Sequence, residues 1–304
     1  MAPGGYAWWY LDALSDDGRH GLVIIAFVGS VFSPYYAFAR RRDAQCDPLQ
    51  HNAVNVSLYS TAGKRWSMTE RDGGALRRGA EHLQIGPSVL EWRGDHLELR
   101  FDERCAPWPS RVRGVVRLFP DLTSSRSWPL DRAGRHHWRP LAPRARVELR
   151  CSTPELRWQG RGYLDCNHGE EPLERAFAGW QWSRAIMDDG GAAVLYDAAA
   201  IDGAVRTLAL RFRRDGGIEP FAAPRAVALP PSAWKLDRSV STDPGRPCAV
   251  HRTLEDGPFY VRSLIDAHWQ GRPVLLMHES LSLRRFASRW VQALLPFRMP
   301  RRRS

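Results

Sequence analysis

Residues 155–190, ELRWQGRGYLDCNHGEEPLERAFAGWQWSRAIMDDG, contain the pattern that decides the fold. The first part alternates with the period of a strand: apolar residues and glycines hold the even positions, and Tyr163 and Asp165 share the odd face. Their backbones are then roughly 7 Å apart. The polar CNHGEEP that follows is typical of a turn, and Trp180 and Trp182 share a face of a second strand. This grouping indicates a functional site; the alternative is a surface Asp that ends a strand.

The second half of this stretch resembles an earlier part of the chain. WQWSRAIMDDG at 180–190 matches WWYLDALSDDG at 8–18, so that Trp8 aligns with Trp180 and Tyr10 with Trp182. Each copy places an aromatic strand before an Asp-Asp-Gly turn and an apolar strand. The similarity predicts two related β-domains that meet near residues 160–175, where ligand sites are common. Chance similarity between two hairpins is the alternative.

The rest of the chain favours an all-β protein. Residues 5–29 predict a hairpin, and Ser33 with Pro34 predicts the start of a short helix. Short strand candidates separated by Gly, Pro, Asp and Ser then follow one another. Residues 120–143, which include RHHWRP, are rich in proline and are expected to be irregular. No helical pattern of any length precedes Arg284.

Composition limits the partners and the compartment. The net charge of +11 favours anionic partners such as nucleic acid or a membrane surface, but the arginines are dispersed and no nucleic-acid motif is present, so no nucleic acid is expected. Five scattered cysteines without a CxxC pair predict reduced thiols in the cytoplasm. The first residues lack the features of a signal peptide, and no apolar stretch is long enough to cross a bilayer.

The C-terminal RRFASRWVQALLPFRMPRRRS has a different character. Phe286, Trp290, Leu294 and Phe297 recur at helical spacing beside arginines, and Pro296 is expected to end the helix. This pattern is typical of an amphipathic helix that lies on an anionic membrane surface. A terminal helix packed on its own domain is an equally good interpretation.

Motifs for several other chemistries are missing. The histidines and cysteines lack zinc-ligand spacing, so no metal is expected, and the chain contains no GxSxG, P-loop or Rossmann glycine pattern. Acid chemistry on an apolar substrate remains, because a buried carboxylic acid can protonate an alkene and aromatic faces stabilise the cation. Arg161 shares the face of Asp165, and an ion pair between them would instead keep the acid ionised.

Several stretches resemble the carotenoid 1,2-hydratases, or hydroxyneurosporene synthases, of photosynthetic bacteria. More distantly, GYLDCNHGEEP and WQWSRAIMDDG resemble two-domain lipocalin-like proteins. The resemblance implies two lipocalin-like antiparallel β-barrel or sandwich domains, residues 1–165 and 166–304, with a short C-terminal amphipathic helix. The similar stretches are GGYAWWYLDALSDDGRHGLVIIAFVGSVFSPYYA, NAVNVSLY, RWSMTER, HHWRP, GRGYLDCNHGEEPLERAFAGWQWSRA and FASRWVQALLPFRMPRR.

This resemblance implies a hydro-lyase that adds water to the terminal C=C of an acyclic carotenoid without a cofactor, giving a tertiary alcohol. The catalytic residues fall on the HxW of RHHWRP, His136 and Trp138, and on the YxD of GRGYLDCNHG, Tyr163 and Asp165. We expect Asp165 to protonate the alkene, Trp138 and Tyr163 to shield the cation, and His136 to orient the acid or deprotonate the water.

The remaining expectations concern binding and location. Trp180, Trp182, Trp8 and Tyr10 are expected to bind the substrate. The protein is expected to be cytoplasmic, held at the inner, photosynthetic membrane by its basic C-terminal segment. A non-catalytic lipocalin-like carrier of carotenoids or other polyisoprenoids is the alternative function.

Overall fold

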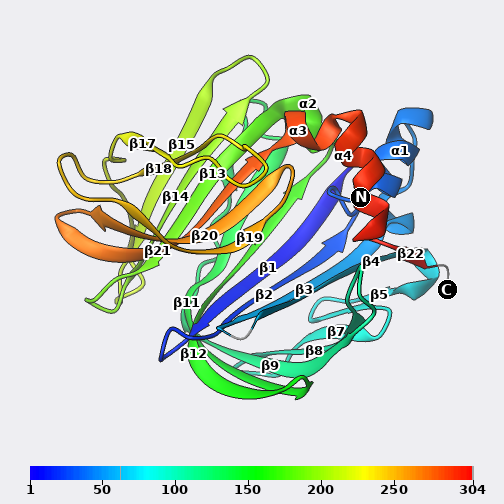
Figure 1. Ribbon diagram of the computed structural model, residues 1–304, viewed down its shortest axis with the longest axis horizontal. Coiled ribbons are helices and arrows are strands. Elements are labelled where there is room, and N and C mark those ends of the chain that lie inside the picture. The colour runs from blue at the N-terminus through cyan, green and yellow to red at the C-terminus, as the bar shows by residue number, and fades with distance from the viewer. Residues whose placement is uncertain (62, 303–304) are drawn as a thin grey trace. The chain divides into compact units, whose positions relative to one another are not determined.

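The protein forms two compact units, each built on its own antiparallel sheet (Figure 1). The computed structural model describes residues 1–61 and 63–302. Unit 1 contains Met1–Pro129, Ala133–Pro172 and Gln292–Ser304, and unit 2 contains Leu130–Arg132 and Leu173–Val291. The expected domains divided after Asp165 and placed the whole C-terminal segment in the second. These expected limits differ from the limits of units 1 and 2. Where independently folding domains begin and end stays a prediction.

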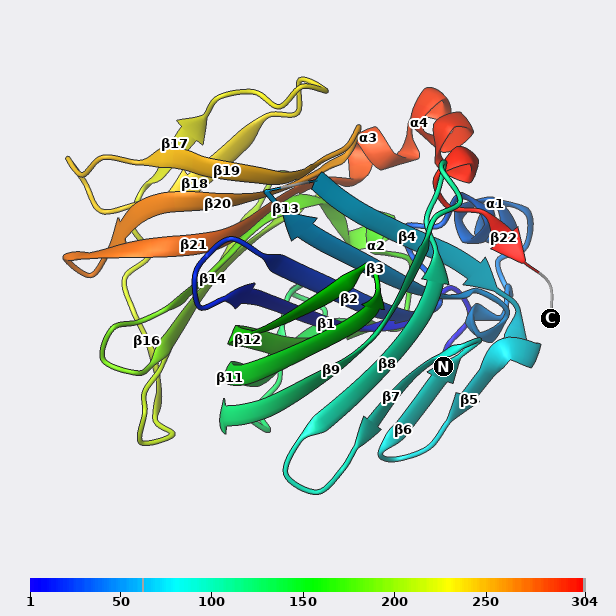
Figure 2. The same ribbon diagram turned by 60° about the horizontal axis from the view of Figure 1, so that its bottom comes forward.

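Unit 1 is a 13-stranded sheet that curls strongly on itself (Figure 2). Its strands lie in the order β22-β4-β3-β2-β1-β12-β11-β9-β8-β7-β6-β5, with β10 paired to β11. Every pair is antiparallel except β22 with β4. The strands are β1 (Tyr6–Ser15), β2 (Gly21–Val28), β3 (Asn52–Ser60), β4 (Gly63–Arg71), β5 (Leu76–Arg78), β6 (His82–Ile85), β7 (Ser88–Trp92), β8 (Leu97–Arg104), β9 (Arg111–Leu122), β10 (Trp128–Pro129), β11 (His136–Thr153), β12 (Glu155–Gly169) and β22 (Arg301–Arg302).

The core of unit 1 lies on the concave side of this sheet. Leu11, Ile24, Val56 and Leu164 belong to one buried apolar cluster, as strand alternation requires of residues that share a face. The predicted alternation of β12 is confirmed, because its even positions face this core. Tyr163 and the acid two residues later therefore lie on the opposite face of the sheet.

Two stretches expected to be irregular are strands, so these predictions are wrong. CNHG continues β12 as far as Gly169, and RHHWRP begins the long strand β11. Both strands pair along their length, with His136 opposite Gly169 and Trp138 opposite Asn167. The ladder satisfies the backbone groups and overrides the local preference of polar residues and prolines for turns.

Unit 2 repeats the strand order of unit 1 on a smaller scale. Its seven-stranded sheet has the order β16-β15-β14-β13-β21-β20-β19, and β17 pairs with β18 separately. In both units the first hairpin, β1–β2 or β13–β14, is flanked by the last long strand, β12 or β21. The two stretches that align in sequence are these hairpins. The strands are β13 (Phe177–Ile186), β14 (Ala192–Ala200), β15 (Val205–Phe212), β16 (Ile218–Pro220), β17 (Ala226–Leu229), β18 (Arg238–Ser241), β19 (Ala249–Asp256), β20 (Tyr260–Trp269) and β21 (Arg272–Ser282).

The helices are short. The predicted cap is confirmed, because Ser33 Oγ accepts hydrogen bonds from the amides of Tyr35 and Tyr36 at the start of α1. Among the described residues, no helix is both long and apolar enough to span a membrane. The helices are α1 (Pro34–Arg42), α2 (Leu173–Ala176), α3 (Leu283–Ala287) and α4 (Arg289–Leu294), with 3-10 turns η1 (Pro48–Gln50), η2 (Gly73–Ala75) and η3 (Leu295–Phe297).

The C-terminal segment is not the single amphipathic helix that was expected. The helix breaks at Ser288, whose backbone is extended, and Phe286 is buried rather than exposed with Trp290. The basic tail is partly docked, since Arg301 lies in β22 and forms an ion pair of 2.6 Å with Glu70. Residues 303 and 304 of this tail lie outside the described residues.

Candidate active site

The candidate site lies on the face of β1, β11 and β12 that is turned away from the core of unit 1. Strand register brings the side chains together: Asp165 is opposite Tyr10 on β1 and Pro140 on β11. The next position along this face of β12 is Asn167, between Trp8 and Trp138. Residues far apart in the sequence are thus neighbours because β12 lies between the other two strands.

Three of the predicted catalytic residues form one hydrogen-bonded group. Trp138 Nε1 and Tyr163 Oη each donate a hydrogen bond of 2.8 Å to Asp165 Oδ2. Trp138 Nε1 also lies 3.2 Å from Tyr163 Oη. Trp138 and Tyr163 are fully buried, and Asp165 is only 4% exposed. The carboxyl group is therefore fixed by two uncharged donors in a mainly aromatic environment.

This arrangement determines where the acid proton sits. Because Oδ2 already accepts two hydrogens, protonated Asp165 carries its proton on Oδ1. Burial and the neighbouring charge of Asp165 raise the pKa of Tyr163 well above its usual 10. The phenol thus remains a hydrogen-bond donor over the whole physiological pH range.

His136 lies on the same face, two residues before Trp138. Its Nδ1 is 2.9 Å from the Tyr6 hydroxyl, and its Nε2 is 3.4 Å from Glu171 Oε1. Gly169 lies beneath these rings, and a Cβ there would approach Tyr6 and His136 to about 2.5 Å. The contacts with Tyr6 and Glu171, which the sequence motifs did not indicate, hold the imidazole in place.

The four predicted substrate-binding residues divide between the units. Trp8 and Tyr10 lie on the site face of β1, where the Tyr10 and Tyr163 rings are 6.3 Å apart. Trp180 and Trp182 are buried in unit 2 on one face of β13. The structure thus brings Trp8 and Tyr10 to the acid, whereas a role for the two unit 2 tryptophans stays a prediction.

Asp165 differs from two other buried carboxyl groups, those of Glu103 and Glu279, in the charge of these hydrogen-bond donors. Glu103 is paired with Arg71 at 2.7 Å, and Glu279 with Arg262 at 2.8 Å. Both of these carboxyl groups thus accept a hydrogen bond from a guanidinium. Asp165 Oδ2 instead accepts from an indole N–H and a phenol O–H, which are both uncharged donors.

Glu279 is also the structural counterpart of Asp165. Tyr10 aligns with Trp182 in the two hairpins; Tyr10 is opposite Asp165 in unit 1, and Trp182 is opposite Glu279 in unit 2. The same position on the same strand therefore carries a carboxyl group in both units. In unit 2 this carboxyl group pairs with Arg262, and in unit 1 it accepts hydrogen bonds from Trp138 and Tyr163.

Arg161 does not form the ion pair with Asp165 that the sequence pattern left open. Arg161 is exposed, whereas Asp165 is buried, and among the described residues Arg161 forms no ion pair with it. Four residues of extended strand separate them by roughly 13 Å.

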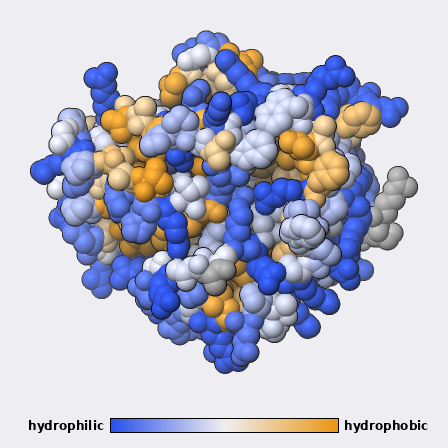
Figure 3. Space-filling view, viewed as in Figure 1, coloured by the Kyte–Doolittle hydropathy of each residue, from blue (hydrophilic) through white to orange (hydrophobic). Residues whose placement is uncertain are grey.

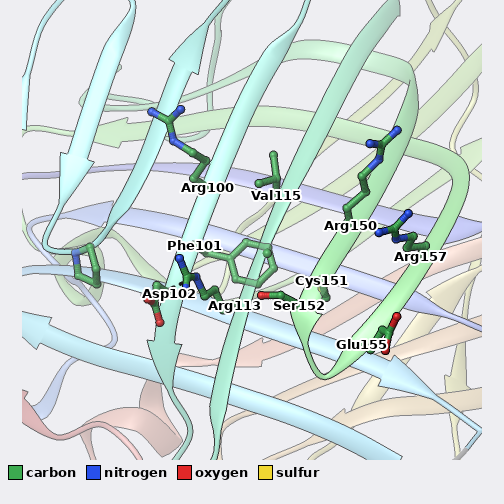
Figure 4. Close-up of a pocket in the computed structure, with 12 residues that line it drawn as sticks. Arg100, Phe101, Asp102, Arg113, Val115, Arg150, Cys151, Ser152, Glu155 and Arg157 are labelled. Atoms are coloured by element: carbon green, nitrogen blue, oxygen red, sulfur yellow. Dashed lines mark ion pairs between the residues drawn. The ribbon is translucent and has the colours of Figure 1, made fainter.

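A hollow of about 770 Å³ elsewhere on unit 1 has the wrong chemistry for an apolar ligand (Figure 4). It opens over β8, β9, β11 and β12, and Arg150 and Arg157 are direct neighbours across two of these strands. Arg157 precedes Asp165 by eight residues on β12, roughly 26 Å of extended chain. This cationic hollow is distinct from the candidate site.

Comparison with known proteins gives consistent results. Residues 24–304 match the model of the family described as carotenoid hydratase CrtC. The acyclic carotenoid 1,2-hydratase of Thiocapsa roseopersicina is 54% identical over 302 residues, which cover 99% of this chain and 74% of that protein. The acyclic carotenoid 1,2-hydratase of Rubrivivax gelatinosus is 48% identical over 303 residues, with 99% and 75% covered.

Solved structures with low sequence identity share the fold. A protein described as AttH from Nitrosomonas europaea superposes with a TM-score of 0.63 at 17% identity, covering 91% of this chain and 92% of its own. CghA, solved with Sch210972, has a TM-score of 0.58 at 13% identity, with 93% and 89% covered. The first of these neighbours has a lipocalin-like fold, which confirms the expected fold class.

Proposed function

We propose a catalytic mechanism from the premise that this chain belongs to the carotenoid hydratase CrtC family. It is a hydro-lyase of carotenoid biosynthesis whose substrates are an acyclic carotenoid and water. The proposal assigns the acid of the reaction to Asp165. The observation that carries it is the pair of donors on Asp165 Oδ2, because the Trp138 N–H and the Tyr163 O–H fix a buried carboxyl group among aromatic rings.

The reaction begins with proton transfer from Asp165 Oδ1 to C2 of the terminal C1=C2 bond. The two electrons of the π bond form the new C–H bond, which leaves a tertiary cation at C1. Water then forms a C–O bond at C1, and its surplus proton returns to the carboxylate. The sum is one water added per double bond, and Asp165 ends protonated as it began.

Aromatic side chains supply the remaining stabilisation. The faces of Trp138, Tyr163 and Tyr10 attract a cation through their quadrupoles, most strongly where water is excluded. The two donors on Oδ2 stabilise the carboxylate that forms when the proton leaves. His136, held by Tyr6 and Glu171, lies on the same face, and we assign it the role of orienting the acid.

Replacing Asp165 by Asn tests the assignment. The amide preserves the shape but has no acidic proton, so we expect hydration of lycopene to fall by at least about 100-fold. The circular dichroism spectrum should keep its β character. Glu279→Gln is the matched control, since it changes the counterpart carboxyl in unit 2, and its folded fraction should hydrate lycopene at the normal rate. Turnover by Asp165→Asn at the wild-type rate would refute the acid role.

The second part of the proposal is peripheral binding to an anionic membrane. In unit 2, the exposed rings of Trp234 and Trp290 stack with centroids 6.0 Å apart, and the Arg285 guanidinium lies 5.3 Å from the Trp290 ring. Apolar side chains also reach the surface over α4, among hydrophilic ones (Figure 3). Aromatic rings beside cations suit the interface of an anionic bilayer, where a carotenoid dissolves. The site of action is then the cytoplasmic face of the inner membrane.

Vesicle flotation measures this binding. The double change Trp234→Ala and Trp290→Ala should release the protein from vesicles that contain anionic lipid, and added salt should release the wild type. Trp108→Ala, which removes a tryptophan that is 81% exposed elsewhere, should change nothing. Equal flotation of all three proteins would contradict the proposed surface.

A further inference from the structure

Asn167 occupies the position next to the acid on the site face. It follows Asp165 by two residues on β12, so that the two side chains point to the same side with backbones roughly 7 Å apart. Its cross-strand neighbours are Trp8 and Trp138. Asn167 is 2% exposed, and it is thus a carboxamide buried between tryptophans.

The amide nitrogen of Asn167 has an unused donor. Among the residues the structure describes, Nδ2 is buried and has no hydrogen-bond partner. Such a group normally costs stability, and buried polar groups in native proteins are paired with protein or with water. An unused N–H in a site for a water-adding reaction indicates a place for that water.

The fold does not require a polar side chain here. In the alignment of the two hairpins Trp8 corresponds to Trp180, which is opposite Leu281 on β21. Leu281 is therefore the counterpart of Asn167 in unit 2, and it is buried as well. Because a buried leucine occupies the equivalent position in unit 2, packing does not require the carboxamide of Asn167, and we look for another role.

We propose that Asn167 binds the water molecule that adds to the carotenoid. This inference rests on the proposed role of Asp165 and names a second residue for the same reaction. Asn167 Nδ2 donates a hydrogen bond to the water oxygen, and one lone pair of that oxygen remains to attack C1. The water donates to Asp165, which becomes its proton acceptor once the acid proton has passed to C2.

The spacing of the two side chains suits this arrangement. Proton transfer and attack each need a heavy-atom approach of roughly 3 Å, and the atoms concerned are the neighbours C1 and C2. A hydrogen bond of roughly 2.9 Å then joins the water to the amide. The acid and the water donor must therefore be adjacent on one surface, as residues at i and i+2 of a strand are.

The role of Asn167 makes a distinctive kinetic prediction. A cation that no water captures returns a proton to Asp165 and restores the alkene. In deuterated water, Asp165 delivers a deuteron to C2, and whenever the original C2 hydrogen is the one returned as a proton, deuterium stays in the recovered carotenoid. Loss of the bound water therefore suppresses hydration more strongly than it suppresses deuterium exchange.

The experiment compares wild type, Asn167→Leu and Asn167→Ala with lycopene in deuterated water, and mass analysis follows both hydrated and recovered carotenoid. Asn167→Leu introduces the residue found at the equivalent position of unit 2. Asn167→Ala removes the donor without adding volume and is used if the leucine variant does not fold. We expect the ratio of exchange to hydration to rise at least about tenfold in both. Asn55→Leu is the control, because it removes a buried carboxamide on β3 whose N–H already donates to the Ser67 carbonyl at 2.7 Å.

The outcomes separate the two proposals. A raised ratio in the Asn167 variants, with an unchanged ratio in Asn55→Leu, supports bound water at Asn167. A parallel loss of exchange and hydration, or normal hydration, overturns it. Exchange and hydration that persist in Asp165→Asn instead overturn the acid assignment.

Discussion

At the scale of the residue, the proposed role of Asp165 depends on the groups that donate hydrogen bonds to its carboxyl group. An indole N–H and a phenol O–H orient Oδ2, whereas buried Glu279 faces the guanidinium of Arg262. Two carboxyl groups at corresponding positions thus have hydrogen-bond donors of different charge. On the proposed mechanism, we expect this difference to suit Asp165, rather than Glu279, to deliver a proton to an alkene.

Removing one donor tests this account. Trp138→Phe keeps an aromatic face but loses the N–H, so the carboxylate that forms after proton transfer is stabilised less. We expect kcat to fall by about tenfold or more. Because the proton-transfer step itself is slowed, deuterium exchange and hydration should fall together, unlike in the Asn167 variants. A wild-type kcat for Trp138→Phe would mean that the hydrogen bond contributes nothing to the reaction.

Sequence reasoning predicted part of this site. Alternation in GRGYLD placed Tyr163 beside Asp165, and the structure places them in contact. His136 and Trp138 came only from family resemblance, because nothing local shows that β11 pairs with β12. Asn167 was missed, since CNHG has the composition of a turn and only the ladder with β1 and β11 makes it a strand. The signal available was the alternation of strand faces: continued from Asp165 to His168, it places Asn167 on the same face as Tyr163 and Asp165.

At the scale of the element, a buried histidine of unit 2 joins neighbouring strands. His278 on β21 has its Nδ1 2.8 Å from Ser183 Oγ and its Nε2 3.1 Å from Ser280 Oγ. Burial, together with the charge of Arg238, lowers the pKa of His278 to about 3. The neutral imidazole therefore links β13 and β21 at any pH at which the protein is native.

This histidine makes unit 2 sensitive to acid. The unfolded chain binds a proton on His278 below about pH 6.5, whereas the folded chain does not bind it until about pH 3. Stability is therefore lost as the pH falls through this window, by about 1.4 kcal/mol per pH unit. Urea titrations at pH 7 and pH 5 measure how much the free energy of unfolding falls between these two pH values. This loss should be about 2 kcal/mol smaller in His278→Gln than in wild type. The exposed His251→Gln serves as control, and an identical acid dependence in all three proteins would rule out this contribution.

At the scale of the whole molecule, the same strand order occurs in both units with different polar groups at equivalent positions. The Asp-Asp-Gly hairpins were visible in the sequence, and each opens a sheet in which the last long strand returns beside the first. Unit 1 keeps the acid and its neutral donors, and unit 2 keeps an ion pair and a leucine at the equivalent places. The return of β12 beside β1 and of β21 beside β13 could not be predicted, nor could the break in the helix at Ser288. All three depend on pairing and packing between distant segments.

The most direct test of the central claim follows the atoms of water into the product. Wild-type protein is incubated with lycopene in liposomes, in water enriched in deuterium and heavy oxygen, and the carotenoids are analysed by mass. Acid-initiated hydration at Asp165 predicts a product with heavy oxygen at C1 and deuterium at C2, absent when Asp165→Asn replaces the wild type. Carotenoid extracted with unchanged mass, or an equally labelled product from Asp165→Asn, would contradict it.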